Sequence, residues 1–232
     1  MTLDASNRRP VRMLAALALI LGALPGAGDP PPAAGKPLSL FDGKGLDGWR
    51  KAEFFKAAEV EVKVEDGSIV LPVGRPMAGI TTTRADLPTL DYELSFEARR
   101  TAGDDFFAAA TFPVGKSFIT LVNGGWGGSV TGLSNLNGSN ASENETTRFV
   151  KYQNGTWYRF RVRVTARVIR AWVDARELFA VEHEDVQVNT RIETRANQPL
   201  GFATWKSAGA VRAITVRPLT PAEVAANDKV EK

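Results

Sequence analysis

Hydrophobic and polar residues alternate with a period of two along much of the chain between residues 37 and 219. The clearest case is residues 91–99, where an aromatic or aliphatic side chain occupies every second position. Such alternation is typical of an antiparallel strand with one buried face. Residues 106–112 and 117–123 are more continuously apolar, which predicts central strands that are covered on both faces.

Further segments carry strand patterns and are separated by turn signals such as Asp66-Gly67 and Asn154-Gly155. These segments are residues 59–65, 68–73, 77–83, 147–153, 156–165, 168–174, 178–182, 191–195, 200–205 and 211–217. Short strands at intervals of about 8 to 12 residues predict an all-β fold. We expect a two-sheet antiparallel jelly-roll sandwich in one domain. Thr220 and Glu223 form a capping-box pattern around Pro221, which predicts a short C-terminal helix.

The N-terminus has a different pattern. Three arginines precede an apolar run over residues 13–24, and small residues follow up to Ala27. This order is typical of a secretory signal, and the run is shorter than the roughly 20 residues that span a bilayer. We predict a signal peptide over residues 1–27, a proline-rich linker over 28–36, the jelly roll over 37–219 and a helical tail over 220–232. An uncleaved N-terminal anchor is the alternative.

These boundaries imply an exported protein, periplasmic or extracellular, whose mature chain has no integral membrane span. Removal of the signal peptide would also change the net charge of the protein. The net charge of +3 falls to about +1 without residues 1–27, because that segment carries three arginines and one aspartate. So small a positive charge does not favour a nucleic-acid partner, which requires a concentrated basic surface. We therefore predict no nucleic-acid binding.

Composition narrows the chemistry further. Cysteine is absent and His183 is the sole histidine, expected in a surface turn. Thiol nucleophiles, cysteine-ligated metals and two-histidine metal motifs are thereby excluded. Acid–base chemistry must rely on carboxylates, lysine or tyrosine. We predict no cofactor and no metal site, and leave open a calcium ion bound by carboxylate and amide oxygens.

The segment over residues 104–147 is the expected location of a site, above all its glycine- and asparagine-rich centre over residues 124–149. Irregular loops of this length in compact domains are usually functional or disordered. The candidate catalytic carboxylates are Asp104, Asp105, Glu143 and Glu145. In an extended chain, the two glutamates would lie roughly 6–7 Å apart on one face, near the separations used in glycoside hydrolysis. The alternative is a solvated turn for the two aspartates and a solvated rim for the two glutamates.

Trp126 stands out because two glycines flank it on each side. A tryptophan presented in this way offers a flat surface for the C–H face of a sugar, although it could instead fill the core. Amide side chains in and beside the same segment suit sugar hydroxyls, or serve only as turn residues. The candidate substrate-binding residues are Trp126, Asn123, Asn135, Asn137 and Trp205. Trp49, Trp157 and Trp172 are interpreted as framework residues.

Two stretches resemble a known family. LFDGKGLDGW (residues 40–49) is similar to the opening of the 3-keto-disaccharide hydrolase domain family, and residues 201–219 are similar to its last two strands. The resemblance covers residues 37–219. It implies an exported, concanavalin A-like jelly roll that cleaves glycosides oxidised to a ketone at the third sugar carbon.

The family's Asn-Ser-Gly-Ile strand and its Tyr-Glu-hydrophobic-Gln stretch are replaced here by DFFAAATFPVGKSFITLVNGGWGG. No catalytic residue of the family is therefore carried over to this chain. We expect an exported carbohydrate-active enzyme whose carboxylate base acts on a glycoside held in a groove. The alternative is a non-catalytic glycan-binding or surface-interaction domain. A carbohydrate is the expected partner, and the oligomeric state is left open.

Overall fold

The computed structural model describes residues 35–54, 57 and 59–230. The predicted signal peptide, and the predicted linker up to residue 34, lie outside the described residues. Among the helices that are described, none has the length and apolar character needed to cross a membrane.

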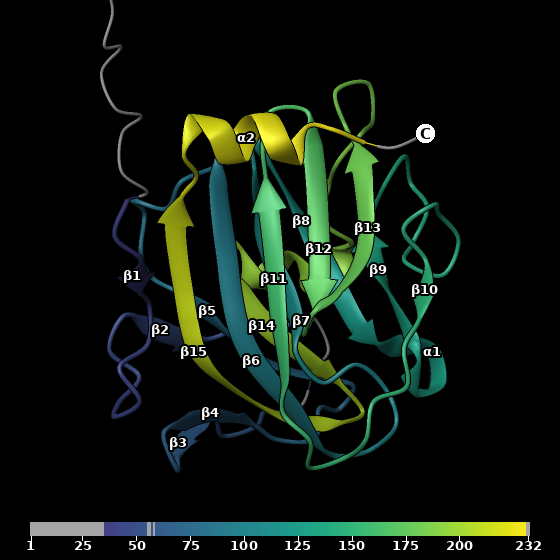
Figure 1. Cartoon of the computed structure of the whole chain (residues 1–232). Coiled ribbons are helices and arrows are strands. Elements are labelled where there is room, and N and C mark those ends of the chain that lie inside the picture. Colours follow the sequence, from purple (N-terminus) through teal and green to yellow (C-terminus); the bar gives the residue numbers. More distant parts are fainter. Residues whose placement is uncertain (1–34, 55–56, 58, 231–232) are drawn as a thin grey trace, which may run out of the picture. The chain divides into compact units, whose positions relative to one another are not determined.

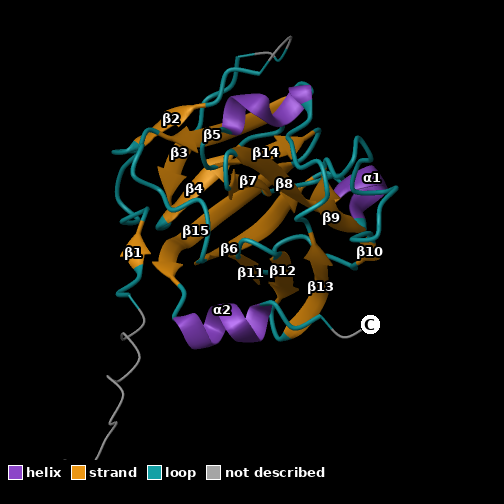
Figure 2. Cartoon of the chain, turned by 90° about the horizontal axis from the view of Figure 1, so that it is seen from above, coloured by secondary structure: helices purple, strands orange, loops and turns teal. Residues whose placement is uncertain are grey.

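Two antiparallel sheets make up the domain (Figures 1 and 2). The strands of sheet A are β1 (Leu38–Ser39), β3 (Lys63–Glu65), β4 (Ser68–Leu71), β6 (Tyr92–Ala102), β11 (Tyr158–Val164), β12 (Val168–Val173), β13 (Arg176–Glu182) and β15 (Ala208–Pro218). They are ordered β13-β12-β11-β6-β15-β4-β3, with β1 paired to β15. In this sheet β1 and β15, the first and last strands of the described residues, are neighbours.

Sheet B faces it with β2 (Trp49–Lys51), β5 (Met77–Thr82), β7 (Ala109–Val114), β8 (Ser117–Gly124), β9 (Val130–Ser134), β10 (Arg148–Phe149) and β14 (Gly201–Trp205). Their order is β10-β9-β8-β7-β14-β5-β2. Three short helical segments complete the described chain: α1 (Gly125–Gly128), the 3-10 helix η1 (Ile192–Asn197) and α2 (Pro221–Asn227). The prediction of an all-β, two-sheet antiparallel sandwich with a short C-terminal helix is confirmed.

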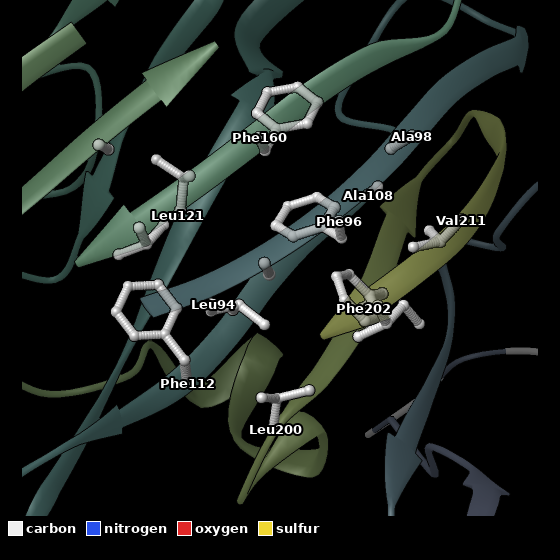
Figure 3. Packing of buried hydrophobic residues seen from close by; sticks show 14 of the residues in the cluster. Leu94, Phe96, Ala98, Ala108, Phe112, Leu121, Phe160, Leu200, Phe202 and Val211 are labelled. Carbon is white, nitrogen blue, oxygen red and sulfur yellow. The ribbon is translucent and has the colours of Figure 1, made fainter. Parts of the chain in front are cut away.

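Aromatic side chains hold the two sheets together (Figure 3). The rings of Phe96 on β6 and Phe160 on β11 are stacked with centroids 5.1 Å apart. Phe202 of sheet B meets Phe96 edge-on at 4.9 Å. All three side chains are fully buried. Contacts of this geometry add stabilisation beyond the burial of apolar area, and the Phe96–Phe202 contact connects the two sheets directly.

Several segments differ from the sequence prediction. The predicted strands 59–65 and 147–153 are shorter, at Lys63–Glu65 and Arg148–Phe149. Residues 191–195 are not a strand, because their backbone closes onto itself: the Thr194 amide donates to the Arg191 carbonyl at 3.1 Å, and η1 results. The glycine-rich centre is also more ordered than expected. It contains β9, whose residues are all buried between β8 and β10. Leu133 belongs to the hydrophobic core, so burial outweighs the cost of ordering this polar segment.

His183 and the framework tryptophans also have defined places. His183 is buried, not in an exposed turn as predicted, and its Nε2 atom lies 3.0 Å from the Thr165 carbonyl. Trp49 is buried, and its indole N–H donates to the Leu40 carbonyl at 2.7 Å. Trp157 and Trp172 are partly exposed and stack against arginine side chains, namely Arg99 and Arg212 for the former and Arg161 and Arg163 for the latter.

The capping box predicted for α2 is present. The Thr220 hydroxyl accepts from the Glu223 amide at 3.2 Å, and the Glu223 carboxylate accepts from the Thr220 amide at 2.9 Å. Arg217 of β15 donates to both carboxylate oxygens of Glu223, at 3.0 and 2.7 Å. The bond with Arg217 is the main reason that the pKa of Glu223 falls to about 2. These contacts fasten α2 to sheet A, on the side away from sheet B (Figure 2).

We predict that Glu223→Gln lowers the free energy of unfolding at pH 7 by about 1 kcal/mol, because glutamine preserves the capping geometry and loses the ion pair. The pKa of Glu223 is lower in the folded state than in the unfolded chain. The stabilisation is therefore complete above about pH 4.5 and disappears as the pH falls toward 2. Urea titrations across this range should show the two proteins converging at low pH. The exposed Glu145→Gln variant serves as the control, and a constant gap at all pH values would contradict the prediction.

Candidate functional site

A cavity of about 360 Å³ opens on the outer face of sheet B. Its floor contains Thr120 and Val122 of β8 and Ser134 of β9. Ile119 and Leu121, which alternate with the two β8 residues, belong to the core between the sheets. The same alternation that builds the core therefore places polar and small apolar side chains under the cavity.

Three aromatic residues line the cavity. Phe106, which precedes β7, and Trp205, at the end of β14, have ring centroids 6.2 Å apart in a tilted arrangement. The backbone amide of Trp205 donates to the Phe106 carbonyl at 3.0 Å and fixes their separation. Trp126 of α1 lines the cavity as well and is 47% exposed. Accessible aromatic faces of this kind provide stacking surfaces for apolar faces of a ligand.

The exposure of Trp126 follows from the backbone of α1. Trp126 has φ 50° and ψ 55°, and Gly127 has φ 83° and ψ 22°, so two successive residues are left-handed. Glycine adopts this conformation at little cost, whereas tryptophan does so at a cost of about 1–2 kcal/mol. Gly124, at φ 74°, makes the preceding bend, and a Cβ atom there would lie 3.2 Å from the Tyr152 ring. The glycines thus permit the turn that holds the indole at the cavity.

Asp105 is the carboxylate next to this turn. Its Oδ1 atom accepts from the Phe106 amide at 2.8 Å, and its own amide donates to the Ser207 hydroxyl at 2.8 Å. Burial raises the pKa of the Asp105 carboxyl above its ordinary value, and the negative charge of Asp104 acts in the same direction. The amide groups of Phe106, Gly127 and Trp126 oppose this rise. The carboxylate therefore becomes a stronger base than an exposed aspartate.

A second polar group reaches the cavity from the η1 segment. Arg191 and Glu193 form a two-point ion pair, with Nε and Nη2 of the arginine 3.2 and 3.0 Å from the two carboxylate oxygens. The bond to Arg191 lowers the pKa of Glu193, which stays ionised. Asn197 secures the segment over sheet B, because its amide nitrogen donates to the Ile80 and Phe202 carbonyls at 2.9 and 3.0 Å.

The structure brings some of the predicted site residues together at the cavity and places the others elsewhere. Asp105, Trp126 and Trp205 line the cavity together. Asp104 is exposed and is not part of the lining. Glu143 is exposed near Arg191, whose pKa it helps to raise, and Glu145 lines a separate hollow with Glu182 and Glu184.

The expected alignment of Glu143 and Glu145 requires an extended chain, and this chain is folded into turns. The Glu143 amide donates to the Asn140 carbonyl at 3.0 Å, and the Thr147 amide donates to the Asn144 carbonyl at 3.0 Å. The argument from strand spacing therefore does not apply to this pair.

The predicted asparagines mostly bind the protein itself. Asn123 is fully buried, and its side chain exchanges hydrogen bonds with the Ala108 amide and carbonyl at 3.1 and 2.8 Å. The Asn137 side chain accepts from the Gln187 amide at 2.8 Å. Neither they nor Asn135 are among the cavity-lining residues, whereas Asn140 is. Asn123 thus connects β8 to the residue that precedes β7, and it is fully buried.

Sequence reasoning did not single out several lining residues: Phe106, Thr120, Val122, Ser134, Arg191, Glu193 and Thr194. The signal for the floor was present, because period-two alternation assigns Thr120 and Val122 to the face opposite Ile119 and Leu121. The η1 residues gave no such signal, since their pattern fits a strand equally well.

A family comparison now identifies the domain. The family model of the 3-keto-alpha-glucoside-1,2-lyase-like domain matches residues 36–217. The chain belongs to this family. The resemblance seen in residues 40–49 and 201–219 is thereby confirmed. Comparison with curated proteins gives no match.

Solved structures with the same architecture include carbohydrate-active proteins. The apo Crh5 transglycosylase superposes with a TM-score of 0.54 at 12% identity, covering 82% of this chain and 85% of the other. A structure from work on endo-acting O-glycanases of human gut microbiota that initiate mucin breakdown has a TM-score of 0.51 at 15% identity, covering 79% and 98%. At these identities the likeness shows a shared jelly-roll fold.

The cavity of this 3-keto-alpha-glucoside-1,2-lyase-like domain combines aromatic stacking surfaces with the Asp105 carboxylate, whose pKa is raised, and with the Arg191–Glu193 ion pair, whose charges cancel. Within the described residues, no group of three or more His, Cys, Asp or Glu side chains is arranged to hold a metal ion. The arrangement suits recognition of an uncharged ring with both apolar and polar faces, together with proton removal by Asp105.

Asn144 is predicted to stabilise the loop that borders the cavity. Its side-chain nitrogen donates to the Leu133 and Asn140 carbonyls, both at 2.8 Å, and its oxygen accepts from the Thr146 amide at 3.0 Å. Asn144→Ala should lower the free energy of unfolding by about 2–3 kcal/mol, because it leaves three partly buried backbone groups without their partner. Urea denaturation provides the measurement, with exposed Glu143→Ala as the control. Equal midpoints for the two variants would refute this role.

Proposed function

We propose that this domain binds a glycoside in the sheet B cavity and cleaves 3-keto-glycosides by elimination, with Asp105 as the base. The observation that carries the proposal is the meeting of Trp126, Trp205 and Asp105 at one cavity in a member of this family. A cavity of about 360 Å³ falls within the usual range for small-molecule sites.

The reaction follows from the chemistry of the ketone. A carbonyl at C3 acidifies the C–H bond at C2, and Asp105 would remove that proton. The electron pair of the C–H bond forms a double bond between C2 and C1, while the C1–O bond breaks. The aglycone leaves with the electrons of that bond and takes a proton from water, and the hydroxide that remains removes the proton from Asp105. Addition of water across the double bond would then complete a net hydrolysis.

Export is part of the proposal. It is supported by the basic and apolar pattern over residues 1–27, which is typical of a secretory signal. The domain would then meet its glycoside outside the cytoplasm.

A second function, non-catalytic sugar binding, is favoured by a specific observation. Both carboxylates that line the cavity already have partners: Asp105 accepts from a backbone amide, and Glu193 is paired with Arg191. A binding domain requires stacking and hydrogen bonds without a free base. The two functions differ in whether the domain converts the bound sugar, with Asp105 as the base, or only binds it.

We expect Asp105→Asn to reduce kcat for 3-keto-trehalose by about 10²–10⁴-fold, because the amide cannot accept the C2 proton. Asp104→Asn is a matched control, since this neighbouring residue is exposed outside the cavity. Release of the leaving sugar, followed by chromatography, gives the rate. Because Asp105 can act as a base only in its ionised form, kcat/KM should fall as the pH drops through its raised pKa. Binding without turnover in the unmodified protein would support the second function, and equal rates in both variants would exclude Asp105 as the base.

Trp126→Ala is expected to weaken glycoside binding about tenfold through loss of the stacking surface. Isothermal titration with the same sugar provides the dissociation constant. Trp172→Ala removes a partly exposed tryptophan from sheet A and should leave that constant unchanged. If both variants bind as tightly as the unmodified chain, Trp126 is not a ligand platform.

A further inference from the structure

Ser134 differs from the other hydroxyl-bearing residues of the cavity. Its side chain is 2% exposed, it lines the floor, and its Oγ atom has no hydrogen-bond partner among the described residues. A buried hydroxyl without a partner carries a desolvation cost that a hydrogen bond would offset. Such a group in a cavity wall indicates a place where a ligand atom completes the bond.

The hydroxyl protons of the neighbouring threonines are already donated in hydrogen bonds. Thr194 donates its proton to the Arg191 carbonyl at 3.3 Å, and Thr120 donates to Thr194 at 3.0 Å. The pair formed by Thr111 and Thr120, 2.9 Å apart, leaves Thr111 as the donor, because Thr120 has one proton and it is already engaged. The direction of donation in this series of hydrogen bonds therefore runs from β7 across β8 to η1.

Ser134 lies directly opposite Thr120 in the pairing of β8 with β9. Cross-strand partners place their side chains on the same face of a sheet, so both hydroxyls are on the cavity floor. Thr120 has no proton left to donate, whereas the Ser134 proton is uncommitted. The floor consequently offers a ligand one free hydroxyl donor at Ser134, next to a row of oxygens that can only accept.

We propose that Ser134 is a ligand-binding residue that donates a hydrogen bond to an oxygen substituent of a bound pyranoside. The inference deepens the proposed function and depends on it. A carbonyl or hydroxyl oxygen of the sugar would take the Ser134 proton, while Trp126 covers an apolar face of the ring. Recognition of the sugar thus includes one polar contact at the base of the cavity, in addition to stacking at its entrance.

The test compares binding with folding stability in the full chain. Ser134→Ala is expected to raise the dissociation constant for 3-keto-trehalose about tenfold, since one hydrogen bond is lost. The melting temperature of the ligand-free protein should stay the same or rise, because the substitution removes an unpaired buried group. Ser95→Ala, in a buried serine of sheet A, is the matched control and should not change binding.

A set of singly deoxygenated trehaloses identifies the contact. In the unmodified protein, removal of the contacted oxygen should weaken binding, and in Ser134→Ala the same removal should have no further effect. Unchanged affinity in Ser134→Ala, alongside normal binding by the unmodified chain, would overturn this inference alone. A lower melting temperature with unchanged affinity would assign Ser134 a structural role. If the unmodified chain binds neither trehalose nor 3-keto-trehalose, the proposed function fails, and this inference fails with it.

Discussion

The alternation of side chains across the strands of sheet B is the constraint on which both the core and the site depend. Ile119 and Leu121 pack between the sheets, so Thr120 and Val122 must point the other way. A shift of register by one residue would exchange these faces and expose the core. The position of the cavity floor is therefore maintained by the hydrophobic effect, although the floor itself contributes little to the core.

The remaining parts of the cavity come from segments far apart in the sequence. Asp105 precedes β7, Trp126 follows β8, Glu193 lies in η1 and Trp205 ends β14. Sheet pairing brings these segments together, since β14 lies between β5 and β7 while β8 follows on the far side of β7. The local environments then give the two carboxylates different pKa values. Burial raises the pKa of Asp105, and an arginine lowers that of Glu193. One fold thus shifts the pKa values of the two cavity carboxylates in opposite directions.

Most of the fold could be predicted because period-two alternation and turn residues report directly on half-buried strands. The site was less accessible to such reasoning. Trp126 was recognisable from its flanking glycines, which signal an unusual backbone. Glu143 and Glu145 looked alike in sequence, yet turn hydrogen bonds direct them to different surroundings. The Arg191–Glu193 pair could not be foreseen, because its place over sheet B depends on contacts of Asn197 with β14, which follows η1, and with β5, which is far away in the sequence.

The left-handed turn at Trp126 has a consequence for how this sequence can change. Asp105 faces the amides of Trp126 and Gly127, so its charge helps to hold an indole whose backbone is otherwise unfavourable. A mutation at either position alters the setting of the other, and their effects will not add. Evolution of this cavity toward a new ligand would then depend on the order of substitutions, because a replacement of Asp105 also removes a support of the turn.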